Sequence, residues 1–204
     1  MAIELSGVGR AYGERVVLRD VTLSVPKGAT LAVFGANGAG KTTLLRILAG
    51  LLRPQAGTVA VQGRIGLLGH EPMLYRDLSV RQNLEFHARL HGVAFARIGE
   101  LLERTGMTAR ADEAVRTLSR GMTQRIAVCR ALLHEPDVLL LDEPYANLDP
   151  AARELVAPLL AGGTRVLVSH DVEEGLAEAD LVLGLRGSRG ALIDGAAAVR
   201  ELYA

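Results

Sequence analysis

The stretch that decides the fold runs from Gly35 to Thr43 and reads GANGAGKTT. It matches the pattern G-x-x-x-x-G-K-[S/T], in which glycines without a Cβ allow backbone N–H groups to approach phosphate oxygens. The apolar-periodic segment 42–52 predicts a helix whose N-terminus points at the same phosphates. Upstream, the β-branched run TLAVF at 30–34 predicts a buried strand. Strand, loop and helix in this order predict a phosphate-binding loop.

The loop offers charge and hydroxyl groups in addition to its backbone. Lys41 supplies a full positive charge, Thr42 offers a hydroxyl suited to Mg²⁺, and Thr43 offers another for a phosphate oxygen. We therefore expect the nucleotide phosphates to be bound by Gly35, Asn37, Gly38, Ala39, Gly40, Lys41, Thr42 and Thr43.

The composition limits the class of protein. The chain has 204 residues, which fits one domain at 1–204, and its 23 basic and 23 acidic residues give a net charge of zero. Because the arginines are scattered, we expect no nucleic-acid partner. The single cysteine, Cys129, is interpreted as a small buried residue on a helix. No apolar run reaches the roughly 20 residues that span a bilayer, and the N-terminus lacks a signal-peptide pattern. We expect a soluble, cytoplasmic protein that meets the membrane only through a partner.

Strands are predicted on both sides of the phosphate-binding loop. Before it, strands are expected at 2–5 and from 16 to 25, joined by a hairpin, with a turn at Pro26-Lys27-Gly28. After the loop helix, two short strands are expected at 57–63 and 64–68. The pattern indicates an antiparallel N-terminal β portion.

The character of the chain changes after residue 70. From about 71 to 135 the apolar spacing is helical, with Ser79 and Ser119 placed as N-caps, which predicts a helical subdomain inserted in the core. From Pro136 strands alternate with helices again, which predicts an α/β fold with a mostly parallel sheet. Ligands of such sheets bind at the carboxyl ends of the strands.

Several side chains outside the loop are candidates for the site. Asp142, Glu143 and His170 each follow the end of a predicted buried strand. Tyr12 either stacks on a nucleotide base or packs on the surface of a hairpin, and its local sequence leaves both readings open. The pair 87 and 91 places two histidines four apart on one helix face, but no acidic third ligand follows, so we expect no metal there.

Five motifs in the same order resemble those of ATP-binding-cassette ATPases. VLLLDEP resembles a Walker B strand followed by a second acid, and LSRGMTQR at 118–125 resembles the LSGGQ signature. YANLD resembles a D-loop and VSH a switch histidine. The resemblance covers the whole chain and implies the P-loop NTPase fold of this family.

The resemblance also implies roles for individual residues. Asp142 would hold Mg²⁺, Glu143 would polarise the attacking water, and His170 would contact the γ-phosphate, while Lys41 holds the phosphates. It further implies a homodimer that sandwiches two ATP molecules. In that dimer Ser119 and Gly121 of one subunit would face the γ-phosphate bound by the other, and Asp149 would cross the interface.

Two departures from the family pattern affect these roles. Arg120 and Met122 replace the usual glycine and glutamine of the signature. His70 falls where the family has the Q-loop glutamine, which makes it a candidate for the contact with Mg²⁺ or its water. The competing reading is that His70 is a bystander at the start of the helical subdomain.

The resemblance favours the ATP-binding subunit of a transporter, partnered by an integral membrane permease at the inner face of the cell membrane. About 75 residues between loop and signature leave no room for the coiled coil of a DNA-repair ATPase, and the chain has one cassette instead of two. The short chain and the GHEP sequence at 69–72 resemble the haem exporter of cytochrome c maturation. Exporters of drugs, lipids or polysaccharides are the alternative, and a soluble regulatory ATPase is a more distant one.

Overall fold

The computed structural model describes residues 1–203, which divide into two compact units. The first unit comprises Met1–Leu67, Asp137–Glu143 and Gly162–Ala204, and the second comprises Leu68–Pro136 and Pro144–Ala161. Each unit is built around its own apolar cluster. Among the described residues, no helix combines the length and the apolar character needed to cross a bilayer.

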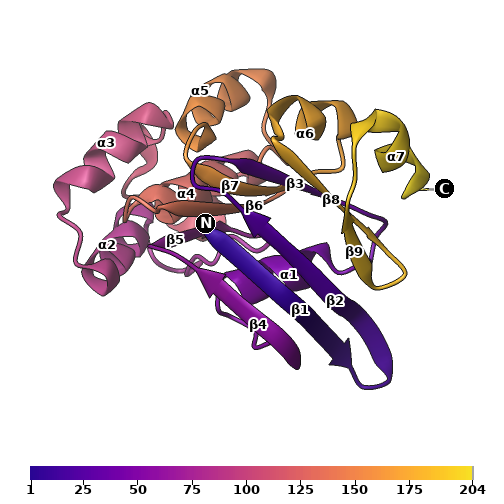
Figure 1. Cartoon of the computed structure of the whole chain (residues 1–204). Helices are drawn as coiled ribbons and strands as arrows, with labels where there is room; N and C mark the ends of the chain where they lie inside the picture. Colours follow the sequence, from indigo (N-terminus) through magenta and orange to yellow (C-terminus); the bar gives the residue numbers. More distant parts are fainter. Residues whose placement is uncertain (204) are drawn as a thin grey trace. The chain divides into compact units, whose positions relative to one another are not determined.

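The first unit carries a mixed sheet (Figure 1), in the order β4-β1-β2-β9-β8-β3-β7-β6-β5. Apart from the last residue of β5, its strands belong to this unit. The bounds are β1 Ile3–Tyr12, β2 Arg15–Val25, β3 Thr30–Phe34, β4 Ala56–Val61, β5 Ile65–Leu68, β6 Val138–Asp142, β7 Thr164–Val168, β8 Leu181–Arg186 and β9 Arg189–Leu192.

The sheet combines a parallel centre with an antiparallel N-terminal part. Strands β8, β3, β7 and β6 run parallel to their neighbours in that order. Strand β1 pairs antiparallel with both β2 and β4, and β8 and β9 form a closing hairpin. The predicted fold class, with a mostly parallel core and an antiparallel N-terminal portion, is confirmed.

The central strands are apolar because both of their faces are covered. Every residue of β3, β6 and β7 is buried. On β3, Leu31 and Val33 join the cluster that contains α1, Lys41–Leu48, whereas Ala32 and Phe34 face the cluster formed with α6, Val172–Glu178, and α7, Gly195–Glu201. The alternation of side chains along a strand therefore places α1 on one face of β3 and the last two helices on the other (Figure 1).

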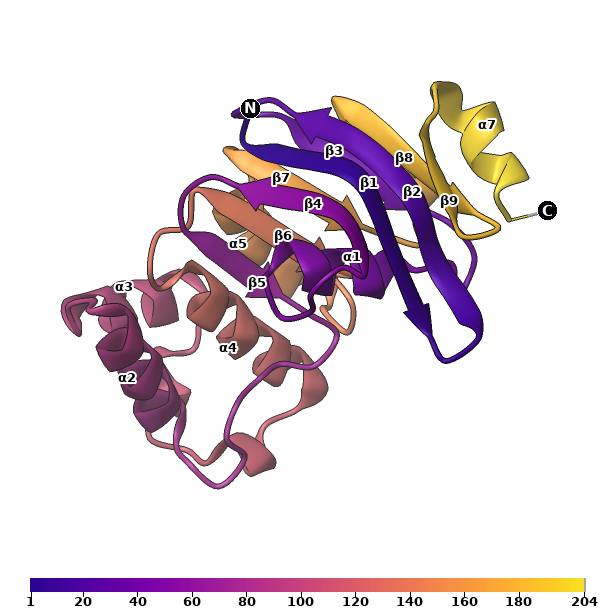
Figure 2. The same ribbon diagram turned by 60° about the horizontal axis from the view of Figure 1, so that its bottom comes forward.

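The second unit is helical. Its helices are α2 Val80–His91, α3 Ala96–Arg104, α4 Arg120–Leu132 and α5 Pro150–Leu160, with 3₁₀ turns η1 Thr108–Arg110 and η2 Val115–Thr117 (Figure 2). The expected N-caps are confirmed, since Ser79 forms a capping box with Gln82 and the Ser119 hydroxyl accepts a hydrogen bond from the Met122 N–H. Cys129 is fully buried on α4, as expected.

Two elements differ from their predicted lengths. Strand β1 continues from Leu5 to Tyr12, because irregular register at Leu5/Val8 and Val8/Arg10 accommodates Gly7 and Gly9 while pairing with β2 is kept. The helix after the loop ends at Leu48, short of the expected Leu52, because the chain turns at Gly50 with a φ of 71°. Both differences come from glycines whose backbone geometry the apolar pattern does not specify.

Candidate functional site

The candidate site lies where three neighbouring parallel strands of the first unit end. Strand β7 lies between β3 and β6 and runs parallel to both. Their carboxyl ends lead into the Gly35–Thr43 loop, His170, and the pair Asp142 and Glu143. The topology therefore brings together residues that are up to 135 positions apart, from Gly35 to His170.

The loop turns sharply into α1 at Gly40. Gly40 has a φ of 108°, and a Cβ there would lie 2.9 Å from Cδ2 of Leu18. A side chain at this position would therefore be strained and would clash with β2. Helix α1 begins at Lys41 with no side-chain cap, so backbone N–H groups of its first turn are left for a ligand.

Lys41 is the cation of the loop and it is 8% exposed. Its Nζ donates hydrogen bonds to the carbonyl oxygens of Gly35 at 2.5 Å and Ala36 at 3.2 Å. Burial lowers the pKa of Lys41, and the charges of Glu143 and Asp142 act in the opposite direction. A buried cation held mainly by loop carbonyls is suited to an anionic ligand.

Thr42 and Asp142 form a pair of oxygen donors. The Thr42 hydroxyl Oγ1 donates a hydrogen bond to Asp142 Oδ2 at 3.0 Å. Asp142 is the last residue of β6 and is buried, whereas Thr42 is exposed. A hydroxyl and a carboxylate are ligands that Mg²⁺ prefers in nucleotide sites, so the residues present fit this ion.

Glu143 is a strained and partly buried carboxylate. Its φ is 52°, unusual for a residue other than glycine, and its backbone N–H donates to the Val168 carbonyl at 3.0 Å. Oε1 lies 3.5 Å from Nε2 of His170, and within the described part of the chain this buried oxygen has no hydrogen-bond partner. Burial raises the pKa of Glu143, although the neighbouring His170 lowers it. The side chain has the character of a proton acceptor.

The remaining loop residues differ in exposure, and the first of them, Gly35, is buried. Asn37 and Gly38 are exposed, and Ala39 and Thr43 are half-buried. Tyr12 ends β1 and is 46% exposed, and the guanidinium carbon of Arg10 lies 5.1 Å from the centre of its ring. Exposure of an aromatic ring is compatible with both readings of Tyr12.

The signature residues lie in the second unit, at the start of α4. A Cβ on Gly121 would lie 2.7 Å from the carbonyl oxygen of Asn147, so glycine permits a close approach of these two backbones. The Gln124 side chain donates to the Pro144 carbonyl at 3.0 Å. Asp149 caps α5, since Oδ1 accepts a hydrogen bond from the Ala152 N–H at 2.8 Å.

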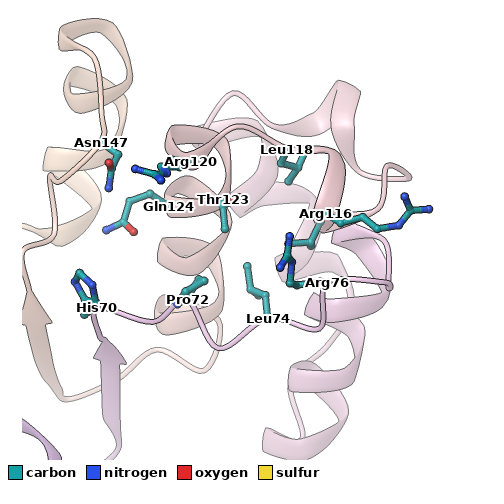
Figure 3. Close-up of a pocket in the computed structure, with 11 residues that line it drawn as sticks. His70, Pro72, Leu74, Arg76, Arg116, Leu118, Arg120, Thr123, Gln124 and Asn147 are labelled. Carbon is teal, nitrogen blue, oxygen red and sulfur yellow. The ribbon is translucent and has the colours of Figure 1, made fainter.

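His70 lines a cavity of about 550 Å³ in the second unit (Figure 3). The cavity has His70, Gln124 and Asn147 at one end and Arg76 at the other (Figure 3). Among the described residues that line it there are three arginines and no carboxylate: His70, Pro72, Leu74, Arg76, Val115, Arg116, Leu118, Arg120, Thr123, Gln124 and Asn147. Two of the three residues that depart from the expected motifs, His70 and Arg120, therefore line one cavity, whereas Met122 does not.

The geometry agrees with comparisons to known proteins. A model of the family described as ABC transporter matches residues 18–146. The chain belongs to the ABC transporter family. A daunorubicin resistance ATP-binding protein, DrrA3 of Streptomyces coeruleorubidus, is 42% identical over 188 residues, which cover 82% of this chain and 60% of that protein. An aliphatic sulfonates import ATP-binding protein, SsuB 3 of Nocardia farcinica, is 40% identical over 194 residues, covering 92% and 78%.

A solved structure described as the ATP binding subunit of an ABC transporter matches with a TM-score of 0.89 at 25% identity, covering 100% of this chain and 98% of that one. Several curated relatives are longer, and the chain spans 60 to 64% of their length. Membership in the ABC transporter family confirms the predicted fold and the expectation that ATP and Mg²⁺ are its ligands.

The structure brings some of the predicted ABC transporter motifs together within one unit. The phosphate loop, Asp142, Glu143 and His170 belong to the first unit, and His70, Ser119, Gly121 and Asp149 belong to the second. Two contacts in the structure were not predicted from the sequence, the helix cap formed by Asp149 and the contact of Arg15 with the loop. Asp149 as a helix cap was signalled by the proline that follows it at the first helical position. The contact of Arg15 with the loop had no local signal.

Proposed function

We propose that this chain is the ATP-hydrolysing subunit of an ABC transporter and that it powers a separate membrane permease. The observation that carries the proposal is the partly buried Glu143 carboxylate, whose Oε1 lies 3.5 Å from Nε2 of His170 and has no hydrogen-bond partner among the described residues, and whose pKa is raised by burial. A carboxylate with a raised pKa accepts a proton more readily than an ordinary one. Glu143 is therefore the general base of the proposed reaction.

The other residues of the first unit would bind and orient the nucleotide. The loop from Gly35 to Thr43 would hold the phosphates, with Lys41 as the cation, and Tyr12 would contact the base. Thr42 and Asp142 would hold Mg²⁺, which when bound neutralises charge on the phosphates. His170 would orient the terminal phosphate, and its place 3.5 Å from Glu143 supports this role. Whether His70 completes the metal site stays a prediction.

We further propose that the active form is a homodimer with two ATP molecules between the subunits. Ser119 and Gly121 at the start of α4 would then face the nucleotide of the partner, and Asp149 would lie at the interface. The proposal is supported by the exposure of Ser119 at a helix N-terminus, where an anion is favoured.

The permease is proposed to bind at the cavity of the second unit. This proposal is supported by the chemistry of the lining, which combines Leu74 and Leu118 with Arg76, Arg116 and Arg120. Such a surface suits an amphipathic segment that carries acidic side chains. The chain would then work at the inner face of the membrane through its permease.

The transported substrate is the least constrained part of the proposal. Haem export was expected from the GHEP sequence and the short chain, and it has no support from relatives whose names refer to daunorubicin resistance and sulfonate import. Export of drugs, lipids or polysaccharides, and a role as a soluble regulatory ATPase, remain alternatives. Identifying the membrane protein that co-purifies with the chain would decide among them.

The proposed chemistry is tested by comparing the wild type with Glu143→Gln in a phosphate-release assay. Glutamine keeps the shape of the side chain but cannot accept the proton, so we expect hydrolysis to fall by about 100-fold or more. ATP affinity should stay within about twofold, since Lys41 and the loop are unchanged. Hydrolysis by the variant at the wild-type rate would show that Glu143 is not the base.

A further inference from the structure

Arg15 reaches the phosphate loop from a different part of the sheet. It is the first residue of β2 and pairs with Tyr12 across the hairpin that joins β1 to β2. Its Nη2 donates a hydrogen bond to the carbonyl oxygen of Gly38 at 3.3 Å. Gly38 is an exposed residue in the middle of the loop. The pairing of the hairpin thus places a guanidinium against the loop that binds phosphates.

The approach of Arg15 to the loop is close. Gly38 has a φ of 81°, and a Cβ built on it would lie 2.8 Å from Nη2 of Arg15 and 3.9 Å from its Cζ. Any side chain at residue 38 would therefore displace the guanidinium. Within residues 1–203, no carboxylate forms an ion pair with Arg15, so its charge is not neutralised by the protein.

Arg10, on the other strand of the hairpin, makes its contacts away from Gly38. Arg10 lies 5.1 Å from the centre of the Tyr12 ring and donates through Nη1 to the Arg53 carbonyl at 3.2 Å. Arg15 is thus the hairpin arginine that contacts the loop at Gly38.

We propose that Arg15 is a phosphate-recognition residue that acts from the outer side of the loop and adds a second positive charge to that of Lys41. This inference rests on the proposed function, because it takes the loop to be the site of the nucleotide phosphates. Since Arg15 is exposed, water and salt screen its charge, and its effect is smaller than that of Lys41. In this arrangement Arg15 attracts the phosphates of the nucleotide, and Tyr12 contacts its base.

The experiment measures binding by calorimetry, with ATP and inorganic tripolyphosphate as probes. We expect Arg15→Ala to raise the Kd of both probes by about threefold to tenfold and to make the Kd less sensitive to salt. Arg15→Lys keeps the charge and should recover most of the affinity. A neutral but polar variant, Arg15→Gln, should behave as Arg15→Ala does.

Two matched variants distinguish phosphate recognition by Arg15 from a general effect of surface charge and from binding of the base. Arg19→Ala removes another exposed arginine of β2 and should leave both Kd values unchanged. Tyr12→Ala should weaken ATP while leaving tripolyphosphate unchanged, since the probe has no base. If Arg15→Ala binds tripolyphosphate as tightly as the wild type, or if the lysine variant is as weak as the alanine variant, the proposed recognition is wrong. A loss of affinity that is accompanied by an equal loss in Arg19→Ala would overturn it as well.

Variants of the two lysines separate the role of Arg15 from that of the loop. The sequence has only two lysines, Lys27 and Lys41, which makes Lys27→Ala the control for Lys41→Ala. Loss of ATP binding in Lys41→Ala alone, with Arg15→Ala unchanged, would reject Arg15 and keep the phosphate loop. Unchanged binding in Lys41→Ala would reject the loop as the nucleotide site.

Discussion

Burial shifts the pKa values of two charged side chains at the candidate site, Lys41 and Glu143. Lys41 is buried and Glu143 is half-buried, and this burial lowers the pKa of the lysine while raising the pKa of the glutamate. Each shift favours the neutral form, yet each group has an oppositely charged neighbour that limits it. A bound polyphosphate would add negative charge beside Lys41 and favour its protonated form. The site is therefore arranged to gain electrostatic stability when an anion arrives.

Cys129 offers a test of how well the second unit is packed. Its thiol is buried on α4 with Oγ1 of Thr105 at 3.2 Å, and burial raises its pKa to about 11. At pH 8 roughly one thiol in a thousand would then be ionised, against about one in ten for a pKa of 9. We expect iodoacetamide to leave native Cys129 unmodified and to alkylate it in urea, as measured by mass spectrometry. Rapid alkylation of the native chain would contradict the burial.

The same pKa shift sets a direction for stability at alkaline pH. The raised pKa means that the unfolded chain loses the thiol proton before the folded chain does. The contribution of the thiol to the free energy of unfolding is therefore complete below pH 9 and is lost as the pH rises to about 11. Cys129→Ser removes the thiol that ionises. Between pH 9 and about pH 11, the urea midpoint of this variant should therefore depend less on pH than the midpoint of the wild type.

Among the secondary-structure elements, the buried strands could be predicted from the sequence because their apolar pattern is local. The strands Thr30–Phe34 and Val138–Asp142 were found because continuous apolar runs mark strands covered on both faces. The candidate site residues at their ends were predicted because their spacing matches known motifs, and their roles stay predictions. Arg15 was missed because its contact depends on the register of a hairpin with a distant loop, which no local pattern contains.

Asp149 shows how one residue serves an element and a proposed interface. Its carboxylate caps α5 through the Ala152 N–H, with Pro150 at the first helical position. We expect Asp149→Ala to lower the free energy of unfolding by about 1 kcal/mol, as measured by urea denaturation. Asp149→Asn should keep the stability, since asparagine caps helices as well as aspartate does.

The asparagine variant also isolates the interface role. If Asp149 meets the partner subunit, Asp149→Asn should weaken ATP-dependent dimerisation although its stability is unchanged. Ser79→Ala, which removes a cap at α2 in the same unit, should lose stability without this effect. Equal dimerisation by Asp149→Asn and the wild type would leave Asp149 as a helix cap alone.

At the scale of the whole molecule, the motifs are divided between the two units. The first unit has the Gly35–Thr43 loop together with Asp142 and Glu143 at the end of β6, and the second has the start of α4 and the cap of α5. In the proposed dimer, the signature of one subunit completes the nucleotide site of the other. In this proposal hydrolysis would control how long the dimer persists, because ATP would join the subunits and its cleavage would release them.

Glu143→Gln tests this arrangement because it separates ATP binding from hydrolysis. The substitution replaces a partly buried carboxylate, whose Oε1 has no hydrogen-bond partner among the described residues, with a neutral group of the same shape. Removing a desolvated charge should leave thermal stability unchanged or raise it. With ATP and Mg²⁺ the variant should elute as a dimer in size-exclusion chromatography, and with ADP as a monomer. Adding Lys41→Ala should abolish the dimer, because ATP would no longer bind. A Glu143→Gln protein that stays monomeric at saturating ATP, while calorimetry shows ATP bound, would reject the dimer and keep the nucleotide site.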